Sequence, residues 1–406
     1  MTADLAWMPA TELARLMRAK ALSPVEVAEA TLARIERLNP RLNAFCTLVP
    51  ESALAAARAA EGAVMRGTPG PLCGVPFSIK DLSWTAGVRT MAGSYIFEHR
   101  VPAFDAPVVE RLKAAGGVML GKTTTPEFGW KGLGDSPLTG ITRNPWNPGM
   151  TTGGSSAGAG AAAAAGLGPL HQGSDGAGSI RIPSAFCGVY GLKPSFGRVP
   201  YWPTPNNDNA SHIGPMTRTV ADAALMLSVM AGPDDRDRTT LDGAPADYVG
   251  RLHEGVRGLR AAWSPTLGGL RVDREVAVLA ARAARAFEEL GCAVEEVEPA
   301  WPDTTTLIRA LWSAHEAGAL AAHLGRWRER MDPGLVACIE DGRRYSAVDY
   351  VELRGRKMEF WDSVRAFFET YDLLLTPSLS VAAFPVGRLN PEGWPQHAWD
   401  WIGWAS

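Results

Sequence analysis

Two hydrophobic spacings alternate along the chain. Apolar residues three or four positions apart predict amphipathic helices on either side of Ser23-Pro24 and over 51–65, 106–117, 219–232, 272–291 and 347–371. Short apolar runs predict strands over 74–80, 118–122, 258–265, 292–299 and 372–377. Because strands and helices alternate, the pattern predicts an α/β fold with helices on both faces of a sheet.

The composition is that of an ordinary globular protein. The 406 residues are 46% hydrophobic and 20% charged, with a formal net charge of -3. This balance offers no basic surface for nucleic acid, and no basic amphipathic segment indicates a membrane surface. The N-terminus lacks the pattern of a secretion signal. We therefore expect one cytoplasmic domain over 1–406, with the helices of about 1–65 packed on its core.

The cysteines do not suggest a disulfide framework or a zinc site. The chain has five, which are far apart in sequence and odd in number: Cys46, Cys73, Cys187, Cys292 and Cys338. Free cysteine is among the most buried residue types, so we expect reduced thiols in the core.

Two short motifs match catalytic patterns whose surroundings are wrong. Residues 116–123 fit a phosphate-binding loop, but a helix precedes them and the loop interior is Val-Met-Leu. Residues 154–158 fit the serine elbow of α/β-hydrolases, with Ser156 as nucleophile, but no strand pattern precedes them. We expect neither chemistry.

Three separated motifs are specific when taken together. Lys80 lies in GVPFSIKD, Ser155 in TTGGSSAG and Ser179 in GSDGAGSIRIPSAFCG. With them the sequence resembles the amidase signature family of serine hydrolases. The connecting motifs occur in that family's order: GKTTTPEF, TRNPWNP, VYGLKPSFGRVP and GPMTRTVAD. The resemblance implies a mixed central β-sheet covered by helices on both faces.

The resemblance also implies a mechanism without metal or organic cofactor. Ser179 would attack the amide carbonyl to form an acyl-enzyme, while Ser155 passes the proton to Lys80 and later returns it to the leaving nitrogen. The peptide bond before Ser155 would be cis. A basic lysine needs its pKa lowered by about 3 to 4 units, which burial at the end of 75–79 can supply. Alternation along a strand should turn Asp81 away from Lys80.

Further residues receive roles around these three. The oxyanion hole would consist of backbone N–H groups, those of Gly176, Ala177, Gly178 and Ser179. Supporting hydrogen bonds are expected from Ser156, Ser174, Asp175 and Arg181. The acyl pocket is assigned to Gly129, Trp130 and Lys131, with Trp130 as a plain core residue left open.

The sequence departs from the family pattern in two places. The family usually has Asp-Thr-Gly-Gly-Ser where this chain has Ala177 within Asp-Gly-Ala-Gly-Ser, and Gly-Gly where it has Ala157-Gly158. Family members also continue beyond the segment that ends near Gly387. We therefore expect that the usual C-terminal segment is missing after about 387–406, and that Trp394, Trp399, Trp401 and Trp404 lie in a partly unsupported loop.

These observations predict an amidase that converts a small carboxylic amide to an acid and ammonia or an amine. Two alternatives stay open. One is the amidase component of a tRNA-dependent amidotransferase, which would supply ammonia to a partner protein. The other is an inactive binding module. Whether the chain forms a homodimer, and which amide it cleaves, are left open by the sequence.

Overall fold

The computed structural model describes residues 2–205 and 210–405, and the chain divides into two compact units. The first unit runs to Arg251 and also contains Glu329–Asp332 and Ala383–Gly387. The second unit contains Leu252–Arg328, Pro333–Ala382 and the chain from Arg388 onward. The expectation of one domain stays a prediction.

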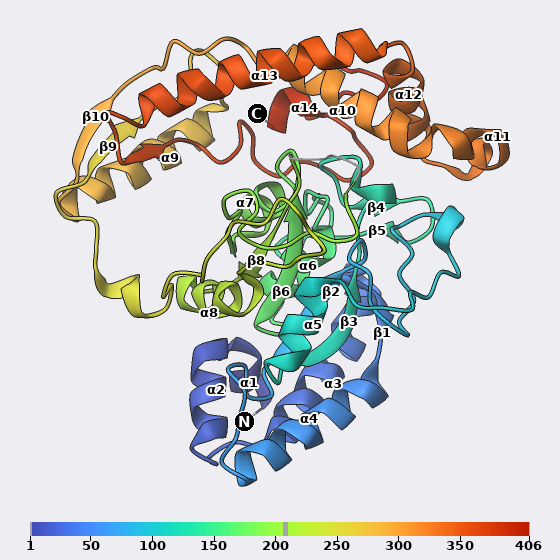
Figure 1. Ribbon diagram of the computed structural model, residues 1–406, viewed down its shortest axis with the longest axis vertical. Helices are drawn as coiled ribbons and strands as arrows, with labels where there is room; N and C mark the ends of the chain where they lie inside the picture. The colour runs from blue at the N-terminus through green and yellow to red at the C-terminus, as the bar shows by residue number, and fades with distance from the viewer. Residues whose placement is uncertain (1, 206–209, 406) are drawn as a thin grey trace. The chain divides into compact units, whose positions relative to one another are not determined.

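The first unit is built on a six-stranded mixed sheet (Figure 1). In spatial order its strands are β1 (Phe45–Leu48), β3 (Val118–Thr123), β2 (Pro76–Lys80), β6 (Leu170–Asp175), β8 (His212–Thr217) and β7 (Tyr190–Gly191). The three strands β3, β2 and β6 run parallel, while β1, β8 and β7 each pair antiparallel with a neighbour. Every residue of the three parallel strands is buried, as expected for a sheet covered on both faces. The predicted mixed α/β fold is confirmed.

Helices surround this sheet. They are α1 (Thr2–Trp7), α2 (Ala10–Arg18), α3 (Pro24–Leu42), α4 (Pro50–Met65), α5 (Pro107–Ala114), α6 (Ala157–Ala164), α7 (Arg181–Cys187) and α8 (Val220–Met230). The predicted break before α3 is confirmed: Pro24 is its first residue, and the hydroxyl of Ser23 accepts hydrogen bonds from the amides of Val25 at 3.0 Å and Glu26 at 3.4 Å. This cap fixes where α3 begins.

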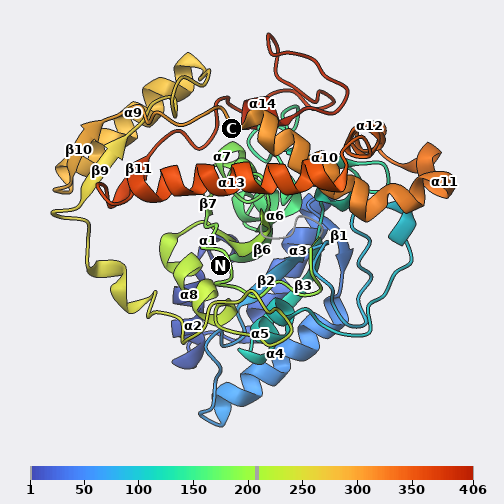
Figure 2. The ribbon, with the colours of Figure 1, turned by 45° about the horizontal axis from the view of Figure 1, so that its top comes forward.

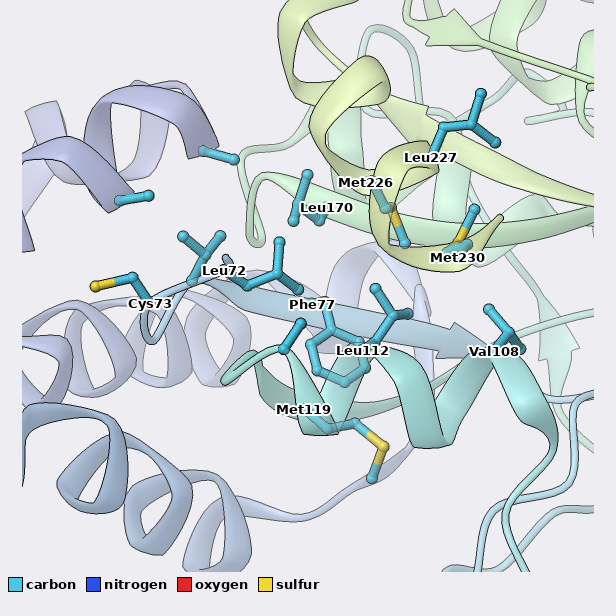
Figure 3. Close-up of a cluster of buried hydrophobic side chains, with 14 of the residues drawn as sticks. Leu72, Cys73, Phe77, Val108, Leu112, Met119, Leu170, Met226, Leu227 and Met230 are labelled. Atoms are coloured by element: carbon cyan, nitrogen blue, oxygen red, sulfur yellow. The ribbon is translucent and has the colours of Figure 1, made fainter. Parts of the chain in front are cut away.

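The main core of the first unit lies around strand β2. Figure 3 shows Phe77 beside Leu112 of α5, with Met226 and Met230 of α8 close by. All four side chains have no exposed surface, and burial of each contributes about 1.5–3 kcal/mol to stability. The five cysteines are free, and all except the half-buried Cys46 are buried. This packing holds β2 rigidly, so that the residue at its end has a fixed position.

The second unit has a parallel sheet of three strands in the order β10 (Ala293–Glu296), β9 (Arg260–Trp263) and β11 (Leu373–Leu375). Figure 2 shows these strands side by side. Its helices are α9 (Arg274–Glu289), α10 (Thr305–Leu320), α11 (Leu324–Trp327), α12 (Pro333–Gly342), α13 (Ala347–Phe367) and α14 (Ile402–Ala405). Every strand and long helix here was predicted from the apolar pattern except α10 and α12.

The expectation of an unsupported tryptophan-rich tail is wrong for three of its four residues. Trp399, Trp401 and Trp404 are at most 4% exposed. The ring of Trp401 packs edge-on against Trp312 with centroids 5.7 Å apart, and Trp404 Nε1 donates a hydrogen bond to the carbonyl of Leu389 at 3.1 Å. Buried indoles with a partner for the N–H are stable core elements, which a sequence window cannot show.

Candidate active site

The structure brings Lys80, Ser155 and Ser179 together within the first unit. Lys80 is the last residue of β2, and its Nζ donates a hydrogen bond to Ser155 Oγ at 2.7 Å. The amide of the following residue, Ser156, donates to the carbonyl of Ser179 at 3.1 Å and so joins the two serine loops. All three predicted catalytic residues are at most 3% exposed. The three motifs therefore form one buried site.

Burial gives Lys80 an unusual protonation equilibrium. Loss of hydration lowers its pKa to about 7, and the nearby charge of Asp175 partly opposes this shift. The amino group also donates to Ser174 Oγ at 3.0 Å and to the Ser174 carbonyl at 3.3 Å. Asp81 is occupied elsewhere, since its Oδ2 accepts a hydrogen bond from the amide of Met91 at 3.0 Å. A neutral, basic form of Lys80 is thus accessible near neutral pH.

The small residues around Ser155 are required by space. The Gly154-Ser155 peptide bond is cis, as the resemblance implies. A Cβ at Gly154 would lie 2.1 Å from the carbonyl oxygen of Leu133, and one at Gly158 would lie 2.1 Å from that of Ala44. Real side chains do not tolerate such distances, so glycine is needed at both positions. The Gly- and Ser-rich run is a packed loop and helix start rather than a linker.

Asp175 organises the loop that carries Ser179. Its Oδ1 accepts from the amide of Gly178 at 2.7 Å, and its Oδ2 accepts from the amide of Ile180 at 3.0 Å. Arg181 pairs with both oxygens, at 2.8 and 3.0 Å. Burial alone would raise the pKa of Asp175, but Arg181 and the two amides outweigh it and hold the pKa well below its usual range. The loop is therefore fixed around a charged carboxylate.

This arrangement divides the four amides that the sequence assigned to an oxyanion hole. The N–H of Gly178 is engaged by Asp175 and is not available to a substrate. Among the residues that the structure describes, the amides of Gly176, Ala177 and Ser179 have no hydrogen-bond acceptor. Three of the four predicted donors thus remain open.

Ser156 is a bracing residue in this geometry. Its hydroxyl donates to the carbonyl of Ser174 at 3.1 Å and accepts from the amide of Ser174 at 3.2 Å. It has no exposed surface. A nucleophile needs a free hydroxyl beside a base, so the rejection of the α/β-hydrolase pattern agrees with the structure.

The phosphate-loop pattern is also explained. Its residues form the buried strand β3, and Lys122 Nζ donates to the carbonyl of Ser83 and to the hydroxyls of Thr85 at 2.9 Å and Thr90 at 3.2 Å. A lysine whose donors are all used inside the protein cannot bind a phosphate group. Lys122 therefore stabilises the loop that follows β2.

The three residues assigned to an acyl pocket have different surroundings. Gly129 lies against the bridging serine, because a Cβ built on it would be 3.1 Å from Ser155 Oγ. Trp130 is 1% exposed, as its plain core alternative expects. Lys131 is 6% exposed and pairs with Asp135 and Asp332, each at 2.7 Å. No sequence signal pointed to Asp332, which is 201 positions from Lys131.

Other kinds of site find little support in residues 2–205 and 210–405. No group of three or more His, Cys, Asp or Glu side chains there is placed to hold a metal ion. Within the same residues, no helix combines the length and the apolar character that a membrane span requires.

Comparisons with known proteins agree with this geometry. A family model described as Amidase matches residues 26–406. An acylamidase of Rhodococcus erythropolis is 42% identical over 396 residues, which are 96% of this chain and 82% of that protein. One component of the glutamyl-tRNA(Gln) amidotransferase of Carboxydothermus hydrogenoformans is 42% identical over 417 residues, covering 96% and 86%. The crystal structure of a bacterial aryl acylamidase of the amidase signature family superposes with a TM-score of 0.92 at 31% identity, covering 98% and 86%.

Proposed function

Since the chain belongs to the amidase signature family and is an amidase that hydrolyses amide bonds, we propose that it cleaves small carboxylic amides unaided, through a relay of Ser179, Ser155 and Lys80. The observation that carries the proposal is the 2.7 Å contact between the buried Lys80 Nζ and Ser155 Oγ. A base poised near neutrality beside a hydroxyl is what activation of a serine requires.

The acylation step moves one proton in two directions. Ser179 Oγ forms a bond to the amide carbonyl carbon and releases its proton to Ser155, which passes its own proton to neutral Lys80. The proton then returns through Ser155 to the amide nitrogen, the C–N bond breaks, and ammonia or an amine leaves. The product of this step is an ester between the acyl group and Ser179.

Hydrolysis of that ester repeats the sequence with water. Water attacks the ester carbonyl while its proton passes through Ser155 to Lys80. Return of the proton to Ser179 Oγ releases the carboxylic acid and restores the site.

The open amides supply the electrostatic part of catalysis. The N–H groups of Gly176, Ala177 and Ser179 would bind the negative oxygen that develops on the carbonyl in both steps. In comparable sites, removal of one such donor costs about 2.7–4 kcal/mol of transition-state stabilisation. Gly178 contributes differently, because its hydrogen bond to Asp175 holds the loop in shape.

One second candidate is favoured by a specific observation. The similarity to a component of a glutamyl-tRNA(Gln) amidotransferase keeps open a role in which the same site releases ammonia for a partner protein. The two functions differ in one measurable property: an independent amidase turns over small amides as a purified chain, whereas a component of a complex needs its partner. No comparison favours the inactive binding module.

Labelling with a fluorophosphonate tests the proposal directly. Intact mass of the wild-type chain should increase by one adduct. Ser179→Ala should form none, and Lys80→Ala should form it far more slowly. Ser156→Ala is the matched control, because it removes a neighbouring hydroxyl and leaves the nucleophile. A folded wild-type protein that takes up no probe would contradict the proposed relay.

A further inference from the structure

A tight turn follows strand β3 and approaches the bridging serine. It comprises residues 127–129, and two of them in succession have a left-handed backbone, Phe128 with φ of 52° and Gly129 with φ of 76°. Such a conformation is unfavourable for phenylalanine by about 1–3 kcal/mol and persists only where the surroundings impose it. The amide of Phe128 donates to the carbonyl of Ala92 at 2.7 Å. The turn is therefore held in place by contacts outside itself.

The consequence of this turn is a close approach at Gly129. A methyl group on Gly129 would lie 3.1 Å from Ser155 Oγ and 2.9 Å from Leu82 Cδ1. The backbone of the turn therefore forms one wall of the space in which the Ser155 hydroxyl lies. A shift of the turn in either direction would crowd that hydroxyl or release it.

Glu127 anchors the first end of the turn. Its side chain has no exposed surface, and its carboxylate accepts hydrogen bonds from Ser94 Oγ and from the amide of Asp332, both at 2.6 Å. Burial raises the pKa of Glu127 to about 7, while these two hydrogen bonds and Lys131 oppose the shift. The charged groups around it are Asp332 and Lys131, and Lys131 in turn pairs with Asp135.

Asp332 also holds the residue at the other end. Its Oδ2 lies 2.7 Å from Lys131 Nζ, while its amide donates to Glu127. One residue, far along the chain but within the same unit, thus contacts both Glu127 and Lys131 on either side of Gly129. Charge-assisted hydrogen bonds between buried groups are the strong ones, so these contacts restrict the turn on both sides.

We propose that Glu127, with Asp332, is a positioning residue of the amidase site: it fixes the turn whose backbone at Gly129 holds the Ser155 hydroxyl between Lys80 and Ser179. This inference rests on the proposed relay. It also gives Lys131 a structural role in place of contact with substrate.

The test separates positioning from binding and from folding. In fluorophosphonate labelling of the purified chain, the maximal rate of adduct formation reports the geometry of the relay, and the concentration for half-maximal rate reports probe binding. Glu127→Leu should lower the maximal rate about ten- to a hundredfold, since displacement of a catalytic group by about 1 Å has effects of this size. The half-maximal concentration should change by less than about twofold. Glu127→Gln should restore most of the rate, because its oxygen can accept from Asp332 and its NH₂ can donate to Ser94.

A matched control addresses simple destabilisation. Asp222 is 1% exposed and accepts from the amide of Thr11 at 3.0 Å, so Asp222→Ala removes a similar buried acceptor between α8 and α2, which carry no site residue. It should lower the melting temperature without changing the maximal labelling rate. If Glu127→Leu does not fold, Gly129→Ala replaces it, with Gly355→Ala in α13 as control because a Cβ there meets no atom within 4 Å.

The possible failures are distinguishable. A wild-type chain that takes up no probe overturns the proposed function and this inference with it. A wild-type chain that is labelled normally, beside folded Glu127→Leu or Gly129→Ala proteins labelled at the same maximal rate, overturns the positioning role alone. A change confined to the half-maximal concentration would assign the turn to substrate binding and also overturn it.

Discussion

The amino group of Lys80 and the hydroxyl of Ser155 lie 2.7 Å apart, although 75 positions separate them in the sequence. The contact joins the end of a buried strand to the loop before α6, and each element is fixed independently by its own packing. A short hydrogen bond between two rigid elements needs little reorganisation, which is what efficient proton transfer requires.

The first prediction concerns the pH dependence of the rate. The base must be neutral, and the pKa of Lys80 is lowered to about 7 by burial. The value of kcat/KM should therefore rise with pH and reach a plateau, with a midpoint near 7. Glu127 has a raised pKa in the same range, so the profile should be repeated with Glu127→Gln. An unchanged midpoint in that variant assigns the titration to Lys80.

The second prediction concerns the bridging hydroxyl. Ser155→Ala removes the path between Ser179 and Lys80 and should lower kcat/KM by about 10²–10⁴, the usual contribution of a positioned proton-transfer group. The melting temperature should change little, because only one oxygen atom is lost. Equal activity of Ser155→Ala and wild type would mean that Lys80 reaches Ser179 without Ser155.

The third prediction uses the glycines. Gly154→Ala and Gly158→Ala place a methyl group 2.1 Å from a backbone carbonyl oxygen, so each should abolish folding or destabilise the protein by more than about 3 kcal/mol. Gly318→Ala in α10 is the control: its Cβ would meet no atom within 4 Å. Since alanine is the better helix former by about 1 kcal/mol, this variant should be slightly stabilised in chemical unfolding.

The fourth prediction concerns Lys122. Lys122→Met leaves the hydroxyls of Thr85 and Thr90 and the carbonyl of Ser83 without their donor, so unfolding should become easier by about 1–3 kcal/mol or more. Nucleoside triphosphate should not raise the melting temperature of the wild type. A clear increase with nucleotide, lost in Lys122→Met, would restore the phosphate-loop interpretation.

The fifth prediction is a dependence of stability on pH through Glu127. Its pKa is raised from 4.5 to about 7 in the folded protein, mainly by burial. Between these values the unfolded chain binds fewer protons than the folded one, so the free energy of unfolding falls as pH rises from about 4.5 to about 7 and is constant above. The contribution is at most about 3 kcal/mol. Glu127→Gln lacks this term, and its stability relative to wild type should therefore be greater at pH 8 than at pH 5.

Some elements escaped the sequence for a physical reason. Strand β6, Leu170–Asp175, contains His, Gln, Ser and Asp and yet is buried along its whole length. Neighbouring strand β2 satisfies these groups: His171 Nδ1 shares a hydrogen bond of 2.7 Å with Ser78 Oγ, and Gln172 Oε1 accepts from the amide of Lys80 at 3.0 Å. Polar residues can form a buried strand when another strand supplies their partners, and an apolar pattern does not record those partners.

The sequence by itself determined the local elements and the chemistry. Continuous apolar runs produced β2 and β3, the Ser23-Pro24 pair set the start of α3, and the motifs identified Lys80, Ser155 and Ser179, because such signals depend on residues close together in the chain. Tertiary structure alone decided which neighbours those residues meet. It gave the amide of Gly178 to Asp175, brought Asp332 to Lys131 and buried Trp401 against Trp312. Contacts of this kind depend on how distant segments pack, and a single sequence carries no local signal for them.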